Sequence, residues 1–127
     1  MWYYVQVRLF KNTWFNRFAK KEGITNAELR EAADRLEAGQ ADADLGGGVY
    51  KVRVARPGEG RTGGYRVIVF FKSEEKTIFV YGFAKSDRAN IENDELQGFK
   101  RDAKTDLSLS DEQIKNRLSK GTLIEVF

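Results

Sequence analysis

The sequence predicts an α/β (α+β) fold, in which a small, mainly antiparallel sheet carries an N-terminal helical hairpin on one face and further helices follow at the C-terminus. Three apolar runs of strand length occupy the middle of the chain, at 49–54, 65–71 and 78–83. Capped amphipathic segments stand before and after these runs. Because the chain has 127 residues, of which 41% are hydrophobic, we expect one domain spanning 1–127.

The N-terminal part predicts a strand and a helix. Apolar and polar residues alternate imperfectly over 2–10, which indicates a strand, expected at an edge of the sheet. Asn12 is expected to cap a short helix that ends at Gly23. The residues on its inward face are apolar and recur at helical spacing: Phe15, Phe18 and Ala19. The basic residues of this helix then point away from the core.

A second helix follows at once. Thr25 and Glu28 have the spacing of a capping box, and Gly39 is expected to end the helix. Its apolar residues lie on one face: Leu29, Ala32, Ala33 and Leu36. We expect the two helices to form a hairpin over one face of the sheet, followed by a short acidic link at 41–45.

The central strands place cations on the sheet. In 49–54 every second residue is apolar, so Lys51 and Arg53 project together from one face. The run 65–71 is apolar on both faces and carries Arg66 on the face that it shares with Ile68 and Phe70. These three cations are therefore expected to lie on strands of the sheet and not on flexible loops.

The links between the strands favour antiparallel pairing. The segment 57–64 is rich in glycine and predicts a turn, and 73–76 is a short polar turn. Because only this short turn joins 65–71 to 78–83, we expect the two strands to pair antiparallel at the centre of the sheet.

The C-terminal part predicts two more helices and a final strand. Asn93 is expected to cap the first, and Ser110 with Gln113 forms a capping box for the second, which ends at Gly121. The apolar face of the first helix contains Leu96, Phe99, Ala103 and Leu107. Residues 122–127 have the composition of a short strand.

Positive charge is concentrated in the middle of the chain. Between residues 50 and 72 the only acid is Glu59, against six basic residues: Lys51, Arg53, Arg56, Arg61, Arg66 and Lys72. One interpretation is a solvated sheet face that Lys and Arg keep soluble. The other is contact with nucleic acid, because aromatic residues stand nearby and can stack on bases: Tyr65, Tyr81 and Phe83.

Several classes of site are excluded or disfavoured. The chain has no cysteine and no histidine, which excludes thiolate chemistry and His-containing triads and removes the usual metal ligands, so we expect no metal and no cofactor. Residues 58–63 match the dinucleotide fingerprint in form, but a strand follows where a helix is needed. No apolar run is long enough to span a membrane and no signal peptide is evident, so we expect a cytoplasmic protein.

Three motifs together resemble a known family. They are Gly-Gly-Gly-Val-Tyr-Lys-Val-Arg-Val-Ala-Arg at 46–56, Gly-Gly-Tyr-Arg-Val-Ile at 63–68, and Tyr-Gly-Phe-Ala-Lys-Ser-Asp-Arg-Ala-Asn-Ile at 81–91. The chain resembles the toxins of bacterial type II toxin-antitoxin pairs, the RelE/ParE superfamily, and within it the RelE/HigB-like branch. This resemblance implies a RelE-like fold and a metal-independent endoribonuclease that cleaves messenger RNA on the ribosome. It also implies a cognate antitoxin, expected to be a helix-turn-helix protein.

The resemblance also implies roles for particular residues. Lys51 and Arg53 fall on the basic pair of the family, Arg66 on the arginine of its Gly-Tyr-Arg motif, and Lys85 on the lysine after the last central strand. These four are the expected catalytic residues, with the arginines holding the phosphate and Lys51 as the preferred base. The residues expected to bind RNA are Arg56, Arg61, Lys72, Tyr81, Phe83 and Arg88.

Two positions depart from the best-studied branch. Ser86 stands where that branch has a catalytic arginine, and Glu92 stands where it has a catalytic tyrosine. Two alternatives therefore stay open beside RNA cleavage. One is inhibition of DNA gyrase, as in the ParE branch, and the other is an inactive RNA- or protein-binding module of the same fold.

Overall fold

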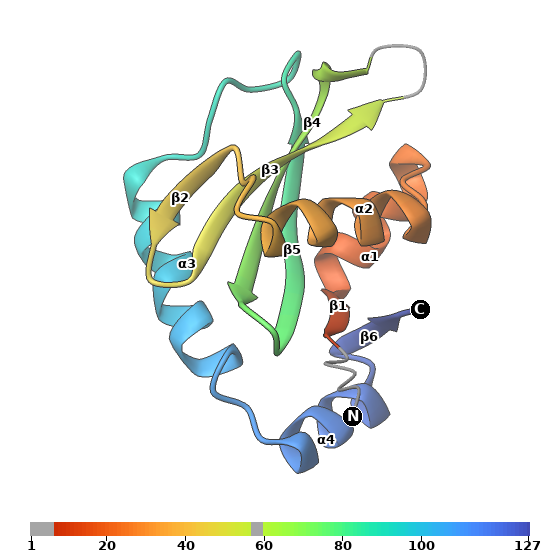
Figure 1. Cartoon of the computed structure of the whole chain (residues 1–127), viewed down its shortest axis with the longest axis vertical. Coiled ribbons are helices and arrows are strands. Elements are labelled where there is room, and N and C mark those ends of the chain that lie inside the picture. The colour runs from red at the N-terminus through yellow and green to blue at the C-terminus, as the bar shows by residue number, and fades with distance from the viewer. Residues whose placement is uncertain (1–6, 57–59) are drawn as a thin grey trace.

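The computed structural model describes residues 7–56 and 60–127, without the side chains of residues 60–63. It contains a six-stranded sheet and four helices (Figure 1). In chain order the elements are β1 (Arg8–Asn12), α1 (Thr13–Glu22), α2 (Asn26–Glu37), β2 (Ala43–Gly46), β3 (Val49–Arg56), β4 (Gly60–Lys72), β5 (Lys76–Ala84), α3 (Asn93–Asp106), α4 (Asp111–Lys120) and β6 (Leu123–Val126). The predicted fold class is confirmed.

The strand order in the sheet is β2-β3-β4-β5-β1-β6. The strands β4 and β5 pair antiparallel in its interior, as predicted. The prediction that the first strand is an edge is wrong. The strand β1 lies between β5, with which it pairs parallel, and β6, with which it pairs antiparallel. The C-terminal strand β6 therefore forms the edge, because it covers the free side of β1.

Two predicted links are partly strands. The acidic link at 41–45 contains most of β2, which pairs with β3. The glycine-rich link at 57–64 is also shorter than expected, because β4 begins at Gly60 and pairs with Arg56 of β3; residues 57–59 lie outside the described residues. Acidic residues and glycine have a low intrinsic preference for strands. In both links backbone pairing with β3 outweighs this preference, because strand propensity is a weak effect compared with tertiary context.

Each face of the sheet has its own core. The helical hairpin of α1 and α2 covers one face, as predicted, with Phe15 and Leu29 packed against Val52 and Val67. The helices α3 and α4 cover part of the other face, where Ala103 and Ile114 join a second cluster that includes Ile68. In Figure 1 the hairpin crosses in front of the strands and α3 runs behind β2 and β3.

The helix boundaries follow local capping. The capping boxes at Thr25 and Ser110 are formed, and Gly23 and Gly121 end their helices in the left-handed conformation, as predicted. One boundary differs: α3 is capped by Glu92 and not by Asn93. The backbone N–H of Glu92 donates to the carboxylate of Glu95 at 2.8 Å, as part of a capping box between these two residues. This capping box starts the helix one residue earlier than predicted.

The turn between β2 and β3 explains one run of glycine. Gly46, Gly47 and Gly48 all have positive φ, between 63° and 88°. A Cβ atom on Gly48 would lie 2.6 Å from Leu107 Cδ1, and one on Gly46 would lie 3.3 Å from Lys100 Nζ. Glycine is therefore needed both for the conformation of the turn and for the close approach of α3.

A β-bulge in β5 decides which side chains face α3. Ile68 pairs with Tyr81 while the next residue of β4, Val69, pairs with Phe79, so Val80 is the additional residue. The shift places Tyr81 and Phe83 on the same sheet face as Ile68. Asn12 supports the bulge, because its Nδ2 donates to the carbonyl of Val80 at 3.1 Å while its Oδ1 accepts from the backbone N–H of Phe15.

We expect Asn12→Ala to lower the free energy of unfolding by about 2 to 3 kcal/mol, because it removes a helix cap and a donor to a backbone carbonyl. Asn12→Asp should lose about 1 kcal/mol, since it keeps the cap acceptor and loses the donor to Val80. Ser110→Ala removes a cap alone and is the matched control. Urea unfolding of the three variants measures the differences, and equal losses for Asn12→Ala and Ser110→Ala would show that the bulge contact contributes nothing.

Candidate active site

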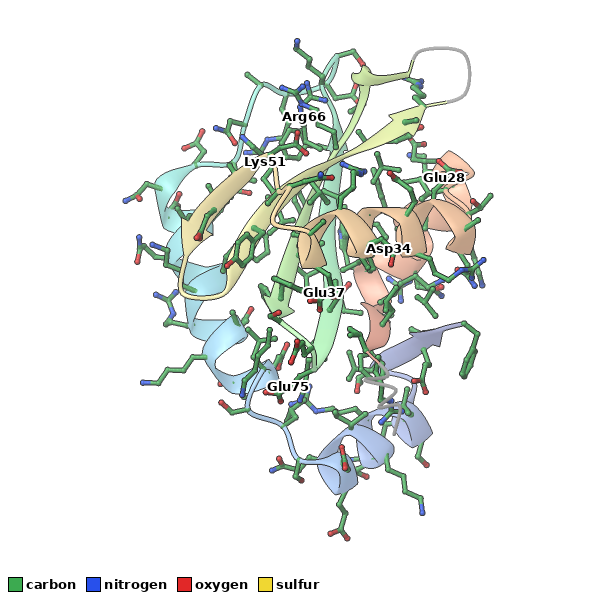
Figure 2. All side chains as sticks on the ribbon, in the orientation of Figure 1. Glu28, Asp34, Glu37, Lys51, Arg66 and Glu75 are labelled. Carbon is green, nitrogen blue, oxygen red and sulfur yellow. The ribbon has the colours of Figure 1, made fainter. Side chains whose placement is uncertain are left out.

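Two rows of side chains cross the sheet on the face shared with α3. Arg53, Arg66 and Phe83 occupy directly opposite positions on β3, β4 and β5. Lys51, Ile68 and Tyr81 form the neighbouring row. Opposite residues on adjacent strands have Cβ atoms about 4.5 to 5.5 Å apart, so the three predicted cations of β3 and β4 are brought together. Figure 2 shows Lys51 and Arg66 at the same end of the sheet.

Arg66 occupies the centre of this group. It is 7% exposed and lies between Arg53 and Phe83 in its row. A guanidinium presents its N–H donors in a planar fork that matches two oxygens of a phosphate. A largely buried and rigidly flanked guanidinium is well suited to hold one phosphate in a fixed geometry.

Arg53 has an acidic neighbour that the sequence did not reveal as part of the site. Its backbone N–H donates to Asp42 Oδ2 at 2.6 Å, and its Nε lies 3.6 Å from Asp42 Oδ1. Arg35 of α2 reaches the same carboxylate, with Nη1 3.9 Å from Oδ2. Asp42 therefore offsets part of the repulsion among the clustered cations and holds Arg53 at the edge of the site.

The segment between β5 and α3 borders the site. Asn90 Oδ1 accepts a hydrogen bond from Lys51 Nζ at 3.4 Å, so this segment reaches the cations of β3. Lys85 is the first residue after β5 and is exposed. The predicted catalytic residues are thus placed on one face or at its border, with Lys51 half-buried and Lys85 in solvent.

Arg88 is a structural anchor of this segment. Its guanidinium forms two hydrogen bonds with the carboxylate of Glu95, at 2.6 and 3.1 Å, and donates to the hydroxyl of Tyr81 at 3.1 Å. It also lies over the ring of Phe83. These hydrogen bonds raise the pKa of Arg88, and the bond from Arg88 lowers the pKa of Glu95. The expected RNA-binding role of Arg88 is therefore limited by its contacts within the protein.

An aromatic wall continues the site toward α1. The ring of Tyr81 lies 6.2 Å from Phe83, 5.8 Å from Phe99 and 4.5 Å from Trp14. Sequence reasoning selected Tyr81 and Phe83 but missed Trp14, because helical periodicity did not place it on the inward face of α1. Its contact with Tyr81 depends on the direction in which α1 leaves the sheet.

Two predicted RNA-binding residues do not join the site, and the side chain of a third is not described. Arg56 lies over the ring of Tyr65, which packs in the core under the helical hairpin. Lys72 lies at the far end of β4, roughly 20 Å along the strand from Arg66, and pairs with Glu75 at 3.1 Å. The side chain of Arg61 is outside the described residues, as is part of the fingerprint at 58–63.

The described ranges, 7–56 and 60–127, contain neither a candidate metal cluster nor a candidate membrane-spanning helix. In these ranges, no three or more His, Cys, Asp or Glu side chains are grouped so that they could hold a metal ion. Of the helices in the described part of the chain, none is sufficiently long and apolar to cross a membrane.

Comparison with protein-family models gives a match over nearly the whole chain. The model of a family described as the RelE toxin of the RelE/RelB toxin-antitoxin system matches residues 7–126. The chain belongs to the RelE toxin family. It is therefore a toxin of a toxin-antitoxin system, and its family implies an antitoxin partner. A search of curated proteins found no match.

The two residues that depart from the best-studied RelE toxins lie in the segment between β5 and α3. Ser86 is exposed in the turn after β5. Glu92 is exposed at the start of α3, where its backbone is held by Glu95. Neither side chain belongs to the two rows of the sheet, so these departures leave the arrangement of Lys51, Arg53 and Arg66 unchanged.

The Arg88–Glu95 pair predicts a pH dependence of stability. Because the pKa of Glu95 is lowered from 4.5, its contribution is complete above that value and is lost as the pH falls through the lowered pKa. The melting temperature of the wild type should exceed that of Glu95→Gln at neutral pH, and the gap should narrow below about pH 4.5. Glu112→Gln, at an exposed position of α4, is the control. A gap that stays constant down to pH 3 would contradict the assignment.

Proposed function

We propose that this toxin is an endoribonuclease that cleaves messenger RNA on the ribosome and so inhibits translation, as in the RelE/HigB-like branch. The observation that carries the proposal is the cluster of Lys51, Arg53 and Arg66 on one sheet face, bordered by the half-buried ring of Tyr81, while Phe83 is 4% exposed and lies beneath Arg88. Cations beside aromatic rings suit an RNA strand, because they bind phosphates and stack on bases.

The reaction requires three actions. The ribose 2′-OH must lose its proton and attack the adjacent phosphorus, the negative charge of the pentacoordinate phosphorane must be stabilised, and the leaving 5′-oxygen must gain a proton. The P–O bond to the 5′-oxygen breaks as the bond to the 2′-oxygen forms. The products are a 2′,3′-cyclic phosphate and a 5′-hydroxyl, and no redox step or co-reactant is needed.

Arg66 is proposed to stabilise the phosphorane. A planar guanidinium has the geometry for two parallel N–H···O bonds to the equatorial oxygens, and Arg66 lies between Arg53 and Phe83 in the row of the site. Such preorganised donors act more strongly in a partly desolvated site than in water. Arg53 is proposed to assist as a second phosphate contact, positioned by Asp42.

Lys51 is proposed as the base that accepts the proton of the 2′-OH, and Lys85 as the group that protonates the leaving oxygen. Lys51 lies on the same face as Arg66 and is oriented by Asn90. Lys85 is exposed on the segment next to the sheet end and can follow the departing strand. The two lysines would therefore act from different sides of the phosphate.

Arg66→Ala should reduce transition-state stabilisation by about 2 to 4 kcal/mol, the loss typical when one preorganised donor is removed. Arg66→Lys should restore little activity, because a single ammonium cannot reproduce the two-pronged contact. Cleavage of cellular RNA, mapped by primer extension after brief induction, measures the effect. Arg101→Ala, an exposed arginine of α3, is the matched control.

Thermal unfolding shows whether each Arg66 variant folds. Full cleavage by a folded Arg66→Ala protein would contradict the mechanism. If folded wild-type protein arrests growth without cleaving RNA, a DNA supercoiling assay tests inhibition of gyrase, the alternative that the residues Ser86 and Glu92 favour. If the folded protein neither cleaves RNA nor inhibits gyrase, the remaining alternative is an inactive RNA- or protein-binding module.

The antitoxin is expected to neutralise the toxin by covering the basic rows with an acidic or apolar segment, because the excess of positive charge there is the natural contact for it. A complex should protect Lys51, Arg53 and Arg66 from solvent, directly or by moving an element over them. Lysine acetylation read by mass spectrometry tests this, with Lys115 of α4 as the exposed reference. Equal labelling of Lys51 in the free toxin and in the complex would exclude masking.

A further inference from the structure

The outer surface of α1 carries a shallow pocket that the proposed catalytic group does not use. Its walls are two aromatic rings and two cations: Trp14, Phe18, Arg17 and Lys21. Trp14 is 42% exposed, which is unusual for a large apolar side chain in this protein. It packs against Phe18 at 5.3 Å and against Tyr81 at 4.5 Å, so its position is fixed from both sides.

The pocket is continuous with the proposed site. Phe83, Tyr81 and Trp14 follow one another at centroid distances of 6.2 and 4.5 Å, from the row of Arg66 to the N-terminal turn of α1. The strand β1 ends at Asn12, so its backbone does not extend along β5 at this point. A strand of RNA that leaves Arg66 and passes Tyr81 therefore reaches Trp14 next.

The charge around the pocket is positive. The helix α1 contains Arg17, Lys20 and Lys21, and its only acid is Glu22 at its last position. Within the described ranges, no acid lies in ion-pair distance of these three basic side chains. Lys11 of β1 lies near this helix: burial lowers its pKa, and the charge of Lys20 lowers it further.

We propose that the pocket of Trp14, Arg17, Phe18 and Lys21 binds a nucleotide of the RNA strand next to the cleaved one, with the base against the indole and the phosphate between Arg17 and Lys21. The inference rests on the proposed function, because the path of the RNA strand is taken to start at Arg66. It adds a second RNA-binding site, which lies on α1. The combination of an exposed aromatic ring with cations that have no acidic partner among the described residues favours single-stranded RNA over an acidic peptide, because a peptide would use the charges and leave the aromatic surface without a partner.

Tryptophan fluorescence tests the site directly. The sequence has two tryptophans, so Trp2→Phe leaves Trp14 as the only tryptophan, and excitation at a wavelength that tyrosine does not absorb reports on it alone. A 2′-O-methylated single-stranded RNA cannot be cleaved and serves as the probe, and the anisotropy of a dye on this RNA reports total binding. We expect saturable quenching of Trp14 that follows the anisotropy. Complete binding without a change in Trp14 emission would overturn the proposal.

Charge variants give an independent measurement. Arg17→Ala with Lys21→Ala should weaken binding about tenfold at low salt and reduce the slope of log affinity against log salt by about 1.4, because two phosphate contacts to a single strand are lost. Lys104→Ala with Lys115→Ala, at exposed positions of α3 and α4, removes the same charge and should change binding little. Equal effects of the two pairs would overturn the proposal, as would quenching by an acidic peptide that displaces the RNA.

The two proposals fail in different ways. A protein that binds the probe with quenching of Trp14 but cleaves no RNA would refute the nuclease and support the α1 site. If the protein cleaves RNA with normal dependence on Arg66 but the emission of Trp14 does not change on RNA binding, only the α1 site is refuted.

Discussion

The pairing of β4 with β5 is the constraint on which the rest of the structure depends. These strands form the interior of the sheet, and both cores are built on their two faces. The bulge at Val80 changes the side of the sheet on which the side chains of the last β5 residues lie. Tyr81 and Phe83 therefore lie on the face of Arg66 and not under the helical hairpin. Asn12 joins this bulge to the start of α1, and thereby couples the hairpin to the site face.

Clustering cations on one sheet face costs electrostatic free energy, and the structure offsets that cost at the borders of the site. Asp42 lies beside Arg53, and Glu95 binds Arg88. Both acids come from segments flanking the sheet, before β3 and in α3, while Arg66 pairs in register with Arg53 and Phe83. Clustered cations raise the local concentration of anionic ligands, which is the physical reason why the cluster suits a phosphate.

Most elements could be predicted because their signals are local. The capping boxes at Thr25 and Ser110 and the left-handed glycines at 23 and 121 depend on neighbouring residues only. The wrong predictions concern relations between distant segments. The placement of β1 between β5 and β6 depends on the C-terminal tail, and β2 exists because β3 offers it an edge.

For the candidate site, the sequence by itself determined that Lys51 and Arg53 share a face, because alternation along a strand fixes the direction of each side chain. The register of β3 with β4 then placed Arg66 opposite Arg53. The sequence also determined the family through its motifs. The tertiary structure alone decided that Arg56 and Lys72 lie apart from this group and that Trp14, Asp42 and Asn90 border it. Those contacts depend on strand register, on a one-residue bulge and on the path of a loop, none of which leaves a periodic signal in the chain.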